Sequence, residues 1–377
     1  MKPDMPFQGS RLRLARLFKG LTLAELGEQV STTRQYIHRL EVSKDQSPSV
    51  ELLSALAETL LVKDDFFFLP LTDEVKEDQG HFRKLQTTPQ NVRQRVLSYG
   101  TMFNMIVNYL DTVLSLPEVN IPTIPVNTIE EIEKAAETCR ERWGLYLDAP
   151  ITNVTRTLEN AGVVVTTFEG VSEKVDAFSL VRGRPVIVRN MDKDSTSRAR
   201  FDLAHECGHL VMHEGIETGD PETETEANRF ASAFLLPRGA FFREFPRTRQ
   251  IDWKAMFHLK DRWGASVQAI VRRASDLGII TAVQYRNANV YMSRNGWKRG
   301  EPCEPQPEFP EIIPLAIKAL KDIQGISCAD MAERLHIAQD ALAVFGIECT
   351  AEPTQIQNVI SLASRRAKIN SSTIHKG

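Results

Sequence analysis

The sequence predicts a mainly α-helical protein with a small β-sheet, an α+β chain of 377 residues. Apolar residues recur at helical spacing through most of the chain, which is typical of amphipathic helices. Three short runs rich in β-branched residues follow one another at 163–168, 177–182 and 185–189, and they predict one small sheet. With 25% charged and 42% hydrophobic residues, the chain is long enough for two or three globular domains.

Charge, cysteine usage and hydropathy limit the class of protein. The net charge of −3 gives no global sign of nucleic-acid binding, so any such sign must be local. Five cysteines without a C-x-x-C pair fit a reducing compartment better than a disulfide framework. No apolar run approaches the ~20 residues of a membrane span, and the N-terminus lacks the apolar core of a signal peptide. We therefore expect a soluble, cytoplasmic protein without a membrane partner.

The first expected domain, residues 1–72, consists of four or five short helices. Thr22 and Glu25 form the sequence signature of a capping box, and Ser49 is a good N-cap residue. Two of the helices, joined by a tight turn through Ser31, make a helix-turn-helix. The main helices are expected at 11–19, 21–30, 33–41 and 50–60.

Over its whole length this unit resembles the XRE (Cro/C1-type) DNA-binding domain of phage repressors. The resemblance makes 33–41 the recognition helix, so double-stranded DNA is the expected partner. Arginine pairs with guanine and glutamine with adenine in the major groove. Ser31 departs from the pattern, because the turn usually has glycine there. The expected base-contacting residues are Thr33, Arg34, Gln35 and His38.

Phosphate contacts are expected from the basic first helix. The candidates are Arg11, Arg13, Arg16 and Lys19. Residues 1–44 contain eight Lys and Arg residues against four Asp and Glu residues, a local excess of four positive charges. A helical adaptor that no longer binds DNA is the alternative, since motif and charge are separable.

Residues 73–125 are expected to connect this domain to the next one. The stretch begins polar, becomes basic and continues as a long amphipathic helix from Pro89 to about Leu116. The apolar side of this helix is either a homodimer interface or a cover for the following domain. We favour the cover, because a single amphipathic helix is usually part of a core. Three prolines then predict an extended connector at 117–125.

A metal-binding pattern stands in the third expected domain, residues 126–245. His205-Glu-Cys-Gly-His209 fits H-E-x-x-H, and on a helix the positions i and i+4 place both imidazoles on one face. Two neutral imidazoles suit Zn²⁺, which binds nitrogen at roughly 2.0–2.1 Å. Glu206 need not bind the metal, so it can move a proton from a metal-bound water to a leaving amine. The helix that carries the pattern is expected at 198–213.

The third ligand is expected on a following helix, at 223–236. Glu224-x-x-Ala-Asn228 resembles the second-helix signature of thermolysin-like zinc peptidases, whose glutamate is the third ligand. The resemblance makes Glu224 the ligand and Asn228 the residue that hydrogen-bonds a ligand histidine. Glu226 is the rival ligand, but it points about 200° away around the helix. His213 lies eight residues after His205, about 12 Å along the first helix, which is too far to bind the same metal, so it is expected to be structural.

From about Ile151 to Pro237 the chain resembles the ImmA/IrrE family of bacterial and phage zinc metallopeptidases. The family is thermolysin-like in topology, and characterised relatives cut, or trigger cutting of, a helix-turn-helix repressor. The edge strand of the small sheet is then expected to bind an extended substrate by strand addition. Cys207 departs from the usual apolar or small residue, but its helical direction points away from the two histidines. The expected fold is thus a helix-turn-helix domain, a thermolysin-like zincin core and a helical C-terminal extension.

The remaining chain is expected to be helical. Residues 246–300 carry two helices, at 252–264 and 267–277, whose tryptophans indicate packing on the catalytic unit. Residues 301–377 begin with a proline- and acid-rich linker at 301–310, and they have no assigned chemistry. Further helices are expected at 312–322, 328–343 and 353–368.

The expected function is that of a DNA-binding transcriptional regulator with a zinc-dependent endopeptidase domain. The substrate would be a repressor or a partner protein, such as a toxin or antitoxin partner, in a stress, phage or mobile-element response. One alternative is a non-cleaving sensor or antitoxin-type transcription factor whose peptidase-like domain binds a ligand or a partner. Another is a toxin-like peptidase whose DNA-binding domain regulates only its own operon. Zinc content does not separate these functions, whereas cleavage does.

Overall fold

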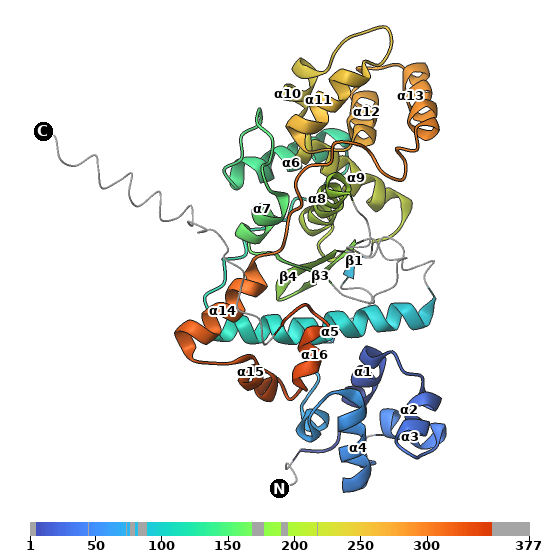
Figure 1. Cartoon of the computed structure of the whole chain (residues 1–377), viewed down its shortest axis with the longest axis vertical. Coiled ribbons are helices and arrows are strands. Elements are labelled where there is room, and N and C mark those ends of the chain that lie inside the picture. The colour runs from blue at the N-terminus through green and yellow to red at the C-terminus, as the bar shows by residue number, and fades with distance from the viewer. Residues whose placement is uncertain are drawn as a thin grey trace, which may run out of the picture. The chain divides into compact units, whose positions relative to one another are not determined.

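The computed structural model describes residues 5–43, 45–72, 74–75, 80–81, 89–167, 177–189, 195–216 and 218–348. Within these ranges the chain forms sixteen α-helices, one 3-10 helix and one small sheet, which confirms the mainly α fold class (Figure 1). None of the helices in the described ranges has the length and apolar character needed to cross a membrane. The helix expected at 353–368 lies outside the described residues.

The N-terminal unit is a bundle of short helices, and two of these helices begin at the N-cap residues that the sequence predicted. Thr22 and Glu25 form the capping box of α2, while Thr33 and Ser49 cap α3 and α4 through their side chains. Gly9 lets α1 cross α3 at backbone contact, because a Cβ there would overlap the Leu40 carbonyl group. The elements are α1 (Gly9–Lys19), α2 (Leu23–Gln29), α3 (Arg34–Val42), α4 (Val50–Leu60) and the 3-10 helix η1 (Asp64–Phe68).

The turn between α2 and α3 uses serine in a conformation that favours glycine. Ser31 has φ 53°, in the left-handed region, which costs a residue with a Cβ roughly 1–2 kcal/mol. The N–H of Thr32 donates to the Gly27 carbonyl at 2.7 Å, and that of Ser31 donates to the Glu28 carbonyl at 3.2 Å. These two bonds form a Schellman-type C-cap. The helix-turn-helix geometry is therefore present despite the departure at Ser31.

The long helix α5 (Gln90–Val113) is buried on the side that faces the rest of the chain. Phe18 of α1 packs on Tyr99, with ring centroids 4.8 Å apart. On the other side, Asp111 forms a bidentate ion pair with Arg184 of the sheet, at 2.7 Å to each oxygen. The helix thus lies between the N-terminal unit and the sheet (Figure 1). Its apolar residues are covered within the same chain, as expected of a core helix.

The sheet has four strands in the order β1-β3-β4-β2 within the described residues. The strands β3 and β4 form an antiparallel hairpin around Gly183, whose φ is 76°. The strand β2 runs parallel to β4, and the two-residue strand β1 runs antiparallel to β3. The bounds are β1 (Gly80–His81), β2 (Val164–Thr167), β3 (Ala177–Arg182) and β4 (Arg184–Arg189).

Helices pack on the sheet and around one another to form the second core. The helix α8 contacts β3 and β4 and packs closely on α9, where a Cβ at Gly208 would lie 3.0 Å from the Phe230 ring. Trp263 is fully buried in this core, as expected from the sequence. The helices are α6 (Ile129–Arg142), α7 (Val154–Asn160), α8 (Thr196–Met212), α9 (Pro221–Leu235), α10 (Arg238–Glu244), α11 (Trp253–Trp263), α12 (Val267–Asp276) and α13 (Ala282–Arg294).

Two expected helices have different bounds in the structure. The sequence pattern predicts a helix from Glu130 to Leu147, but in the structure this helix ends at Arg142, because Gly144 adopts φ 71°. The helix expected at 328–343 is two helices, since His336 adopts φ 55° between them. The C-terminal helices are α14 (Ile312–Gln324), α15 (Cys328–Leu335) and α16 (Gln339–Ala343).

Residues 301–311 are here named the acidic strap. The sequence predicted a linker at 301–310, but the strap is held to the rest of the chain along its length. Glu301 accepts hydrogen bonds from the Lys260 ammonium at 2.9 Å and from the Val267 N–H at 2.7 Å. Glu304 accepts from the same ammonium at 2.6 Å and from the N–H of Ser197, in the first turn of α8, at 2.8 Å. The strap therefore contacts both α8 and its neighbours.

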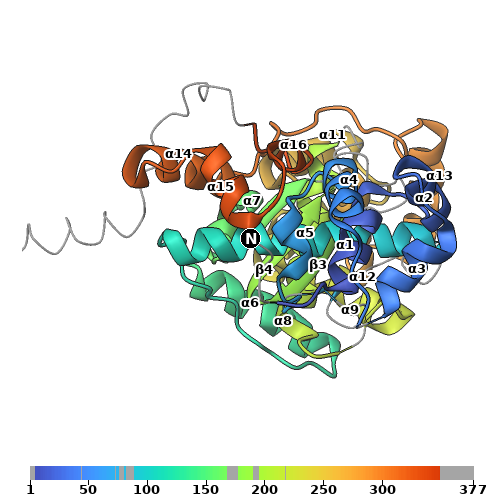
Figure 2. The ribbon, with the colours of Figure 1, turned by 90° about the horizontal axis from the view of Figure 1, so that it is seen from below.

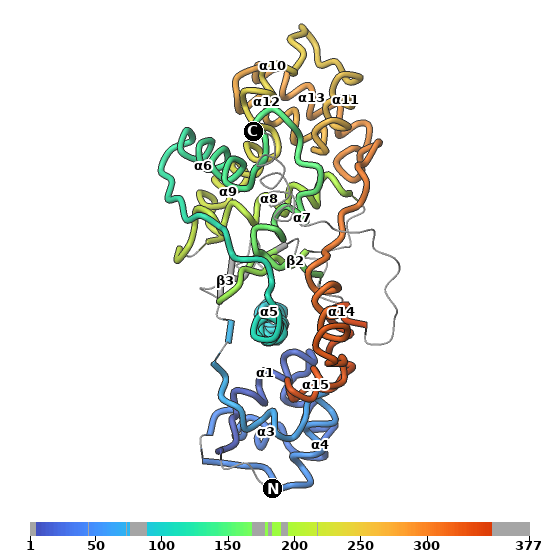
Figure 3. The backbone as a smooth tube through the Cα atoms, turned by 90° about the vertical axis from the view of Figure 1, so that its left-hand side faces the viewer, coloured from blue at the N-terminus to red at the C-terminus, as the bar shows by residue number. Residues whose placement is uncertain are grey.

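The strap continues from α13 to α14 along the second core (Figure 3). Glu308 forms a buried ion pair with Arg200 of α8 and accepts the N–H of Thr155 at 2.8 Å. Glu159 then accepts the backbone N–H groups of Glu311 and Ile312, the N-cap and the first residue of α14. The second half of the strap and the start of α14 are thus fixed to the core by charged hydrogen bonds.

The C-terminal helices return to the N-terminal unit and α5 (Figures 1 and 2). Phe345 stacks on Phe18 with centroids 5.7 Å apart and contacts Phe103 of α5 at 5.3 Å. Val62 and Ile337 form an antiparallel bridge after α4. The region that the sequence left without a role therefore joins the first helix of the N-terminal unit to α5.

Candidate metal centre

Two helices present the residues of the expected zinc site. Ser195 caps the start of α8, and Asp220 caps α9 by accepting the N–H groups of Glu222 and Thr223. Pro221 stands at the first position of α9, where its missing N–H costs nothing. This start places Glu224 in the first turn of α9, opposite the middle of α8.

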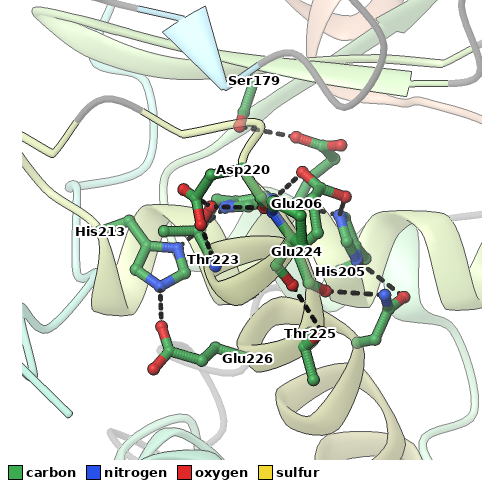
Figure 4. Close-up of polar contacts among 12 residues, drawn as sticks. Ser179, His205, Glu206, His213, Asp220, Thr223, Glu224, Thr225 and Glu226 are labelled. Carbon is green, nitrogen blue, oxygen red and sulfur yellow. Dashed lines mark hydrogen bonds and ion pairs between the residues drawn. The ribbon is translucent and has the colours of Figure 1, made fainter. Parts of the chain in front are cut away.

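Three ligand atoms converge between α8 and α9 (Figure 4). The Nε2 atoms of His205 and His209 lie 3.1 Å apart, and each lies 3.4 Å from an oxygen of Glu224. A tetrahedral ion with bonds of roughly 2.0–2.1 Å has ligand atoms about 3.3 Å apart. Both imidazoles are only 1% exposed, so the three donors face one another away from bulk water. The spacing and the donor types therefore fit Zn²⁺.

The first histidine is oriented by Asn228. The Nδ1 atom of His205 lies 3.2 Å from Oδ1 of Asn228, whose Nδ2 donates to the Glu224 carbonyl at 2.7 Å. That second bond identifies the amide oxygen as the atom facing the ring, so Nδ1 carries the proton. The lone pair on Nε2 then points to the metal position. The structure thus places Asn228 in the position that the resemblance implies.

The second histidine is oriented by a pair that the sequence did not identify. The Nδ1 atoms of His209 and His213 lie 2.9 Å apart, and Nε2 of His213 lies 2.8 Å from the Glu226 carboxylate (Figure 4). A carboxylate accepts, so His213 donates from Nε2 and accepts from His209 at Nδ1. Nε2 of His209 then keeps its lone pair for the metal. The sequence signal for this contact was the four-residue spacing of His209 and His213, which places both rings on one face of the helix.

Glu226 is therefore part of the support for the site and not a third ligand in this arrangement. Its carboxylate contacts His213, whereas the carboxylate of Glu224 contacts both histidines that share the metal position. Within the described ranges, His205, His209 and Glu224 form the one cluster of three or more side chains suited to hold a metal ion. The geometric argument that separated the two glutamates on the helix agrees with this arrangement.

Glu206 lies beside the cluster in a fully buried position (Figure 4). The Ser179 hydroxyl of β3 donates to its Oε2 atom at 2.7 Å. Burial raises the pKa of Glu206 to about 7, against the opposing effects of His205 and of the Ser179 hydrogen bond. A carboxylate with a pKa near neutrality can both take and return a proton. The arrangement is therefore suited to general acid–base chemistry.

The other ionisable groups are in the states that metal binding requires. Burial lowers the pKa of His209 to about 4, so its imidazole is neutral at neutral pH. Burial alone would raise the pKa of Glu224, but the neighbouring His205 and His209 imidazoles bring it below its usual range. Burial raises the pKa of the Cys207 thiol well above its usual value, so it remains protonated in the apolar core.

The expected base-contacting residues lie on the exposed surface of the N-terminal unit. Arg34, Gln35 and His38 are exposed on α3. Thr33 is exposed directly before the helix, and its hydroxyl oxygen accepts the Tyr36 N–H at 3.2 Å while its hydrogen remains available to donate. These four side chains are therefore accessible to a groove of DNA.

Two of the expected phosphate contacts are wrong. Arg16 is buried and forms a bidentate ion pair with Glu41, at 2.5 and 2.9 Å. Arg11 is buried over the Phe66 ring and donates to the carbonyl groups of Leu69 and Pro70. Both guanidinium groups bind the protein itself, so they stabilise the fold and do not face phosphate. Of the expected set, Arg13 and Lys19 are exposed.

Family models of known proteins match two separate segments of the chain. A family model described as a helix-turn-helix domain matches residues 9–65, which span α1 to the start of η1. A peptidase family model described as an IrrE N-terminal-like domain matches residues 158–275, and this range includes the metal cluster and Glu206. No curated protein matches the chain. The chain therefore joins an XRE-like helix-turn-helix domain to an IrrE N-terminal-like domain, the organisation of a DNA-binding regulator with a peptidase-like domain.

Proposed function

We propose that this protein is a transcriptional regulator whose IrrE-like domain is a zinc-dependent endopeptidase of the thermolysin-like type. The observation that carries the proposal is the geometry of the site. The two imidazole Nε2 atoms lie 3.1 Å apart, and each lies 3.4 Å from a different oxygen of Glu224. The buried Glu206 carboxylate, which is not among these groups, stands beside them. A structural zinc site is usually closed by four protein ligands, whereas a hydrolytic site has three and leaves one position for water.

The roles of the residues follow from this arrangement. His205, His209 and Glu224 would hold the ion, which when bound supplies Lewis acidity to a water molecule and to the peptide carbonyl group. Glu206 takes the proton of the attacking water and returns it to the amine that leaves. Ser179 holds one oxygen of Glu206, which limits the orientation of the carboxylate. Asn228 and His213 keep the ligand histidines aligned.

We infer that the substrate is a partner protein and that the N-terminal unit directs the regulator to DNA. The exposed residues of α3 would read base edges, with Arg34 suited to guanine and Gln35 to adenine. Arg13 and Lys19 are the remaining candidates for phosphate contacts. A repressor or a toxin or antitoxin partner is the substrate class that the two domains together suggest. A sensor that binds such a partner without cutting it is the competing function.

The substitution Glu206→Gln separates the peptidase from the sensor. Glutamine has nearly the shape of glutamate but cannot accept the proton of water, and loss of general acid–base catalysis costs roughly 10²–10⁴-fold. A reporter on the native promoter should lose its response to an inducing stress in this variant, while zinc content and DNA binding remain those of the wild type. Glu222→Gln, an exposed change on α9, is the matched control. A normal response with Glu206→Gln would favour the sensor.

A further inference from the structure

The strand β1 lies at the edge of the sheet that is nearest to the catalytic carboxylate. In the part of the chain that the structure describes, the sheet order is β1-β3-β4-β2, so β1 is the strand outside β3 at this edge. The pairing is antiparallel, with Gly80 opposite Leu180 and His81 opposite Ser179. In sequence, β1 belongs to the connector between the helix-turn-helix domain and α5, about 100 residues before β3. A segment from outside the matched peptidase domain thus completes its sheet.

Ser179 links this edge to the site. Its hydroxyl donates to Glu206 at 2.7 Å, and its backbone stands opposite His81. Because paired Cα atoms in antiparallel strands are about 4.5–5.5 Å apart, the backbone at His81 lies within about 10 Å of the Glu206 carboxylate. Figure 4 shows the pale blue arrow of β1 beside the strand that carries Ser179. An extended peptide is therefore already paired next to the candidate catalytic centre.

An open sheet edge binds extended peptides through backbone hydrogen bonds, a mode known as strand addition. In the structure, the position of an added strand on β3 is filled by β1. We propose that the outer edge of β3 is the peptide-binding edge of the metal centre, and that the chain's own interdomain connector occupies it through β1. A substrate peptide from another protein must then displace β1 before it is cut. This inference deepens the proposed function, because it takes the metal centre to be a site for peptides.

The size of β1 makes displacement feasible. Only two residues pair with β3, and strands in globular proteins usually have five or six. A segment of the same chain nevertheless competes strongly, since tethering can raise its effective concentration into the millimolar range. Because β1 pairs weakly but is present at a high effective concentration, peptides with low affinity for the β3 edge do not displace it, whereas peptides with high affinity do. The connector would thus set a threshold of affinity for the substrate.

The test compares two changes in β1 within the full chain. The double variant Gly80→Pro, His81→Pro removes both backbone N–H groups of β1, so pairing with β3 is weakened. The control Gly80→Ala, His81→Ala changes the same positions but keeps both N–H groups. Both are made in the Glu206→Gln background and loaded with zinc, which prevents cleavage during the measurement. The probe is a fluorescent peptide with the sequence of residues 76–88, and fluorescence anisotropy gives its dissociation constant.

The proline variant should bind the peptide at least tenfold more tightly than the alanine control, because it lacks the internal competitor. Equal affinities, or no binding to the proline variant, would overturn the proposal. The result does not depend on catalysis. If the peptide binds as expected but the chain with Glu206 intact cleaves no protein, the peptide-binding edge stands and the proposed peptidase function fails.

Discussion

At the scale of single residues, His213 shows how the site is supported beyond its ligands. Its ring lies between the His209 imidazole and the Glu226 carboxylate, at 2.9 and 2.8 Å. It is 2% exposed, so water cannot easily replace it as the partner of His209. Groups that orient metal ligands in this way typically contribute 10–100-fold to metal affinity.

We therefore expect His213→Ala to weaken zinc binding by roughly 10–100-fold while the three ligands remain in place. Competition with a chromogenic chelator measures the dissociation constant. Glu226→Gln keeps an oxygen that can accept from His213, so this variant should lose less affinity than His213→Ala. Wild-type zinc affinity in a folded His213→Ala protein would show that the ring does not position His209.

Two of the three arginines of α1 that were expected to bind phosphate, Arg13 and Arg16, make a second prediction at this scale. Arg16→Ala leaves the buried Glu41 carboxylate without its bidentate partner, which should cost roughly 3–5 kcal/mol of unfolding free energy. Arg13 is exposed on the same helix, so Arg13→Ala should leave stability close to the wild type.

The same pair should behave in the opposite way in DNA binding. Arg13→Ala should lower the slope of log DNA affinity against log salt concentration by about one in magnitude, as expected for the loss of one phosphate contact. Urea denaturation and salt titration of DNA affinity give the two quantities. If Arg16→Ala left the protein stable but reduced the salt dependence of DNA binding, Arg16 would be a phosphate contact, and the role inferred from its ion pair with Glu41 would be wrong.

Sequence reasoning succeeded where the chemistry is local to one helix and failed where it depends on distant partners. The spacing of His205 and His209 places both rings on one face of any helix, whatever surrounds it. The burial of Arg11 and Arg16 could not be predicted in this way. Their acceptors are Leu69 and Pro70, almost 60 residues away, and Glu41, 25 residues away. A basic amphipathic helix has the same sequence pattern whether its arginines face phosphate or carbonyl groups.

At the scale of elements, the acidic strap shows the same limit. A segment rich in proline and glutamate is typical of a linker. Here its glutamates bind Lys260, Arg200 and the first turn of α8, which lie 41 to 108 residues earlier. Nothing in the local pattern separates a solvated acidic linker from one that neutralises buried cations. The capping residues Thr22 and Ser49, by contrast, act on N–H groups three residues away and were predictable.

The strap gives a prediction about stability. Glu301→Gln removes the charge that faces the fully buried Lys260 ammonium, and it should lower the free energy of unfolding by roughly 3 kcal/mol. The control is Glu333→Gln, which removes an exposed ion pair with Lys63 and should cost less than about 1 kcal/mol. Urea unfolding followed by tryptophan fluorescence measures both. Equal effects would mean that the buried pair does not hold the strap.

At the scale of the whole molecule, the described chain connects its two functional regions twice. The first connection runs through β1 and α5, between the helix-turn-helix domain and the sheet. The second runs through the acidic strap and returns with Phe345, which packs on Phe18 of α1. Both connections contact the neighbourhood of the active-site helix, through Ser179 and Ser197. Within the described residues, two separate sets of contacts therefore join the N-terminal unit to the surroundings of the candidate metal centre.

The central claim is that His205, His209 and Glu224 hold a zinc ion, and that Glu206 transfers protons beside the ion without binding it. Elemental analysis of purified full-length variants tests this most directly. The wild type and Glu206→Gln should contain one zinc per chain, His205→Ala and His209→Ala should contain none, and Glu224→Ala should retain only a small fraction. Glu226→Ala should retain more zinc than Glu224→Ala. A wild-type protein that binds no zinc, or a Glu224→Ala protein that keeps its metal while Glu226→Ala loses it, would contradict the account.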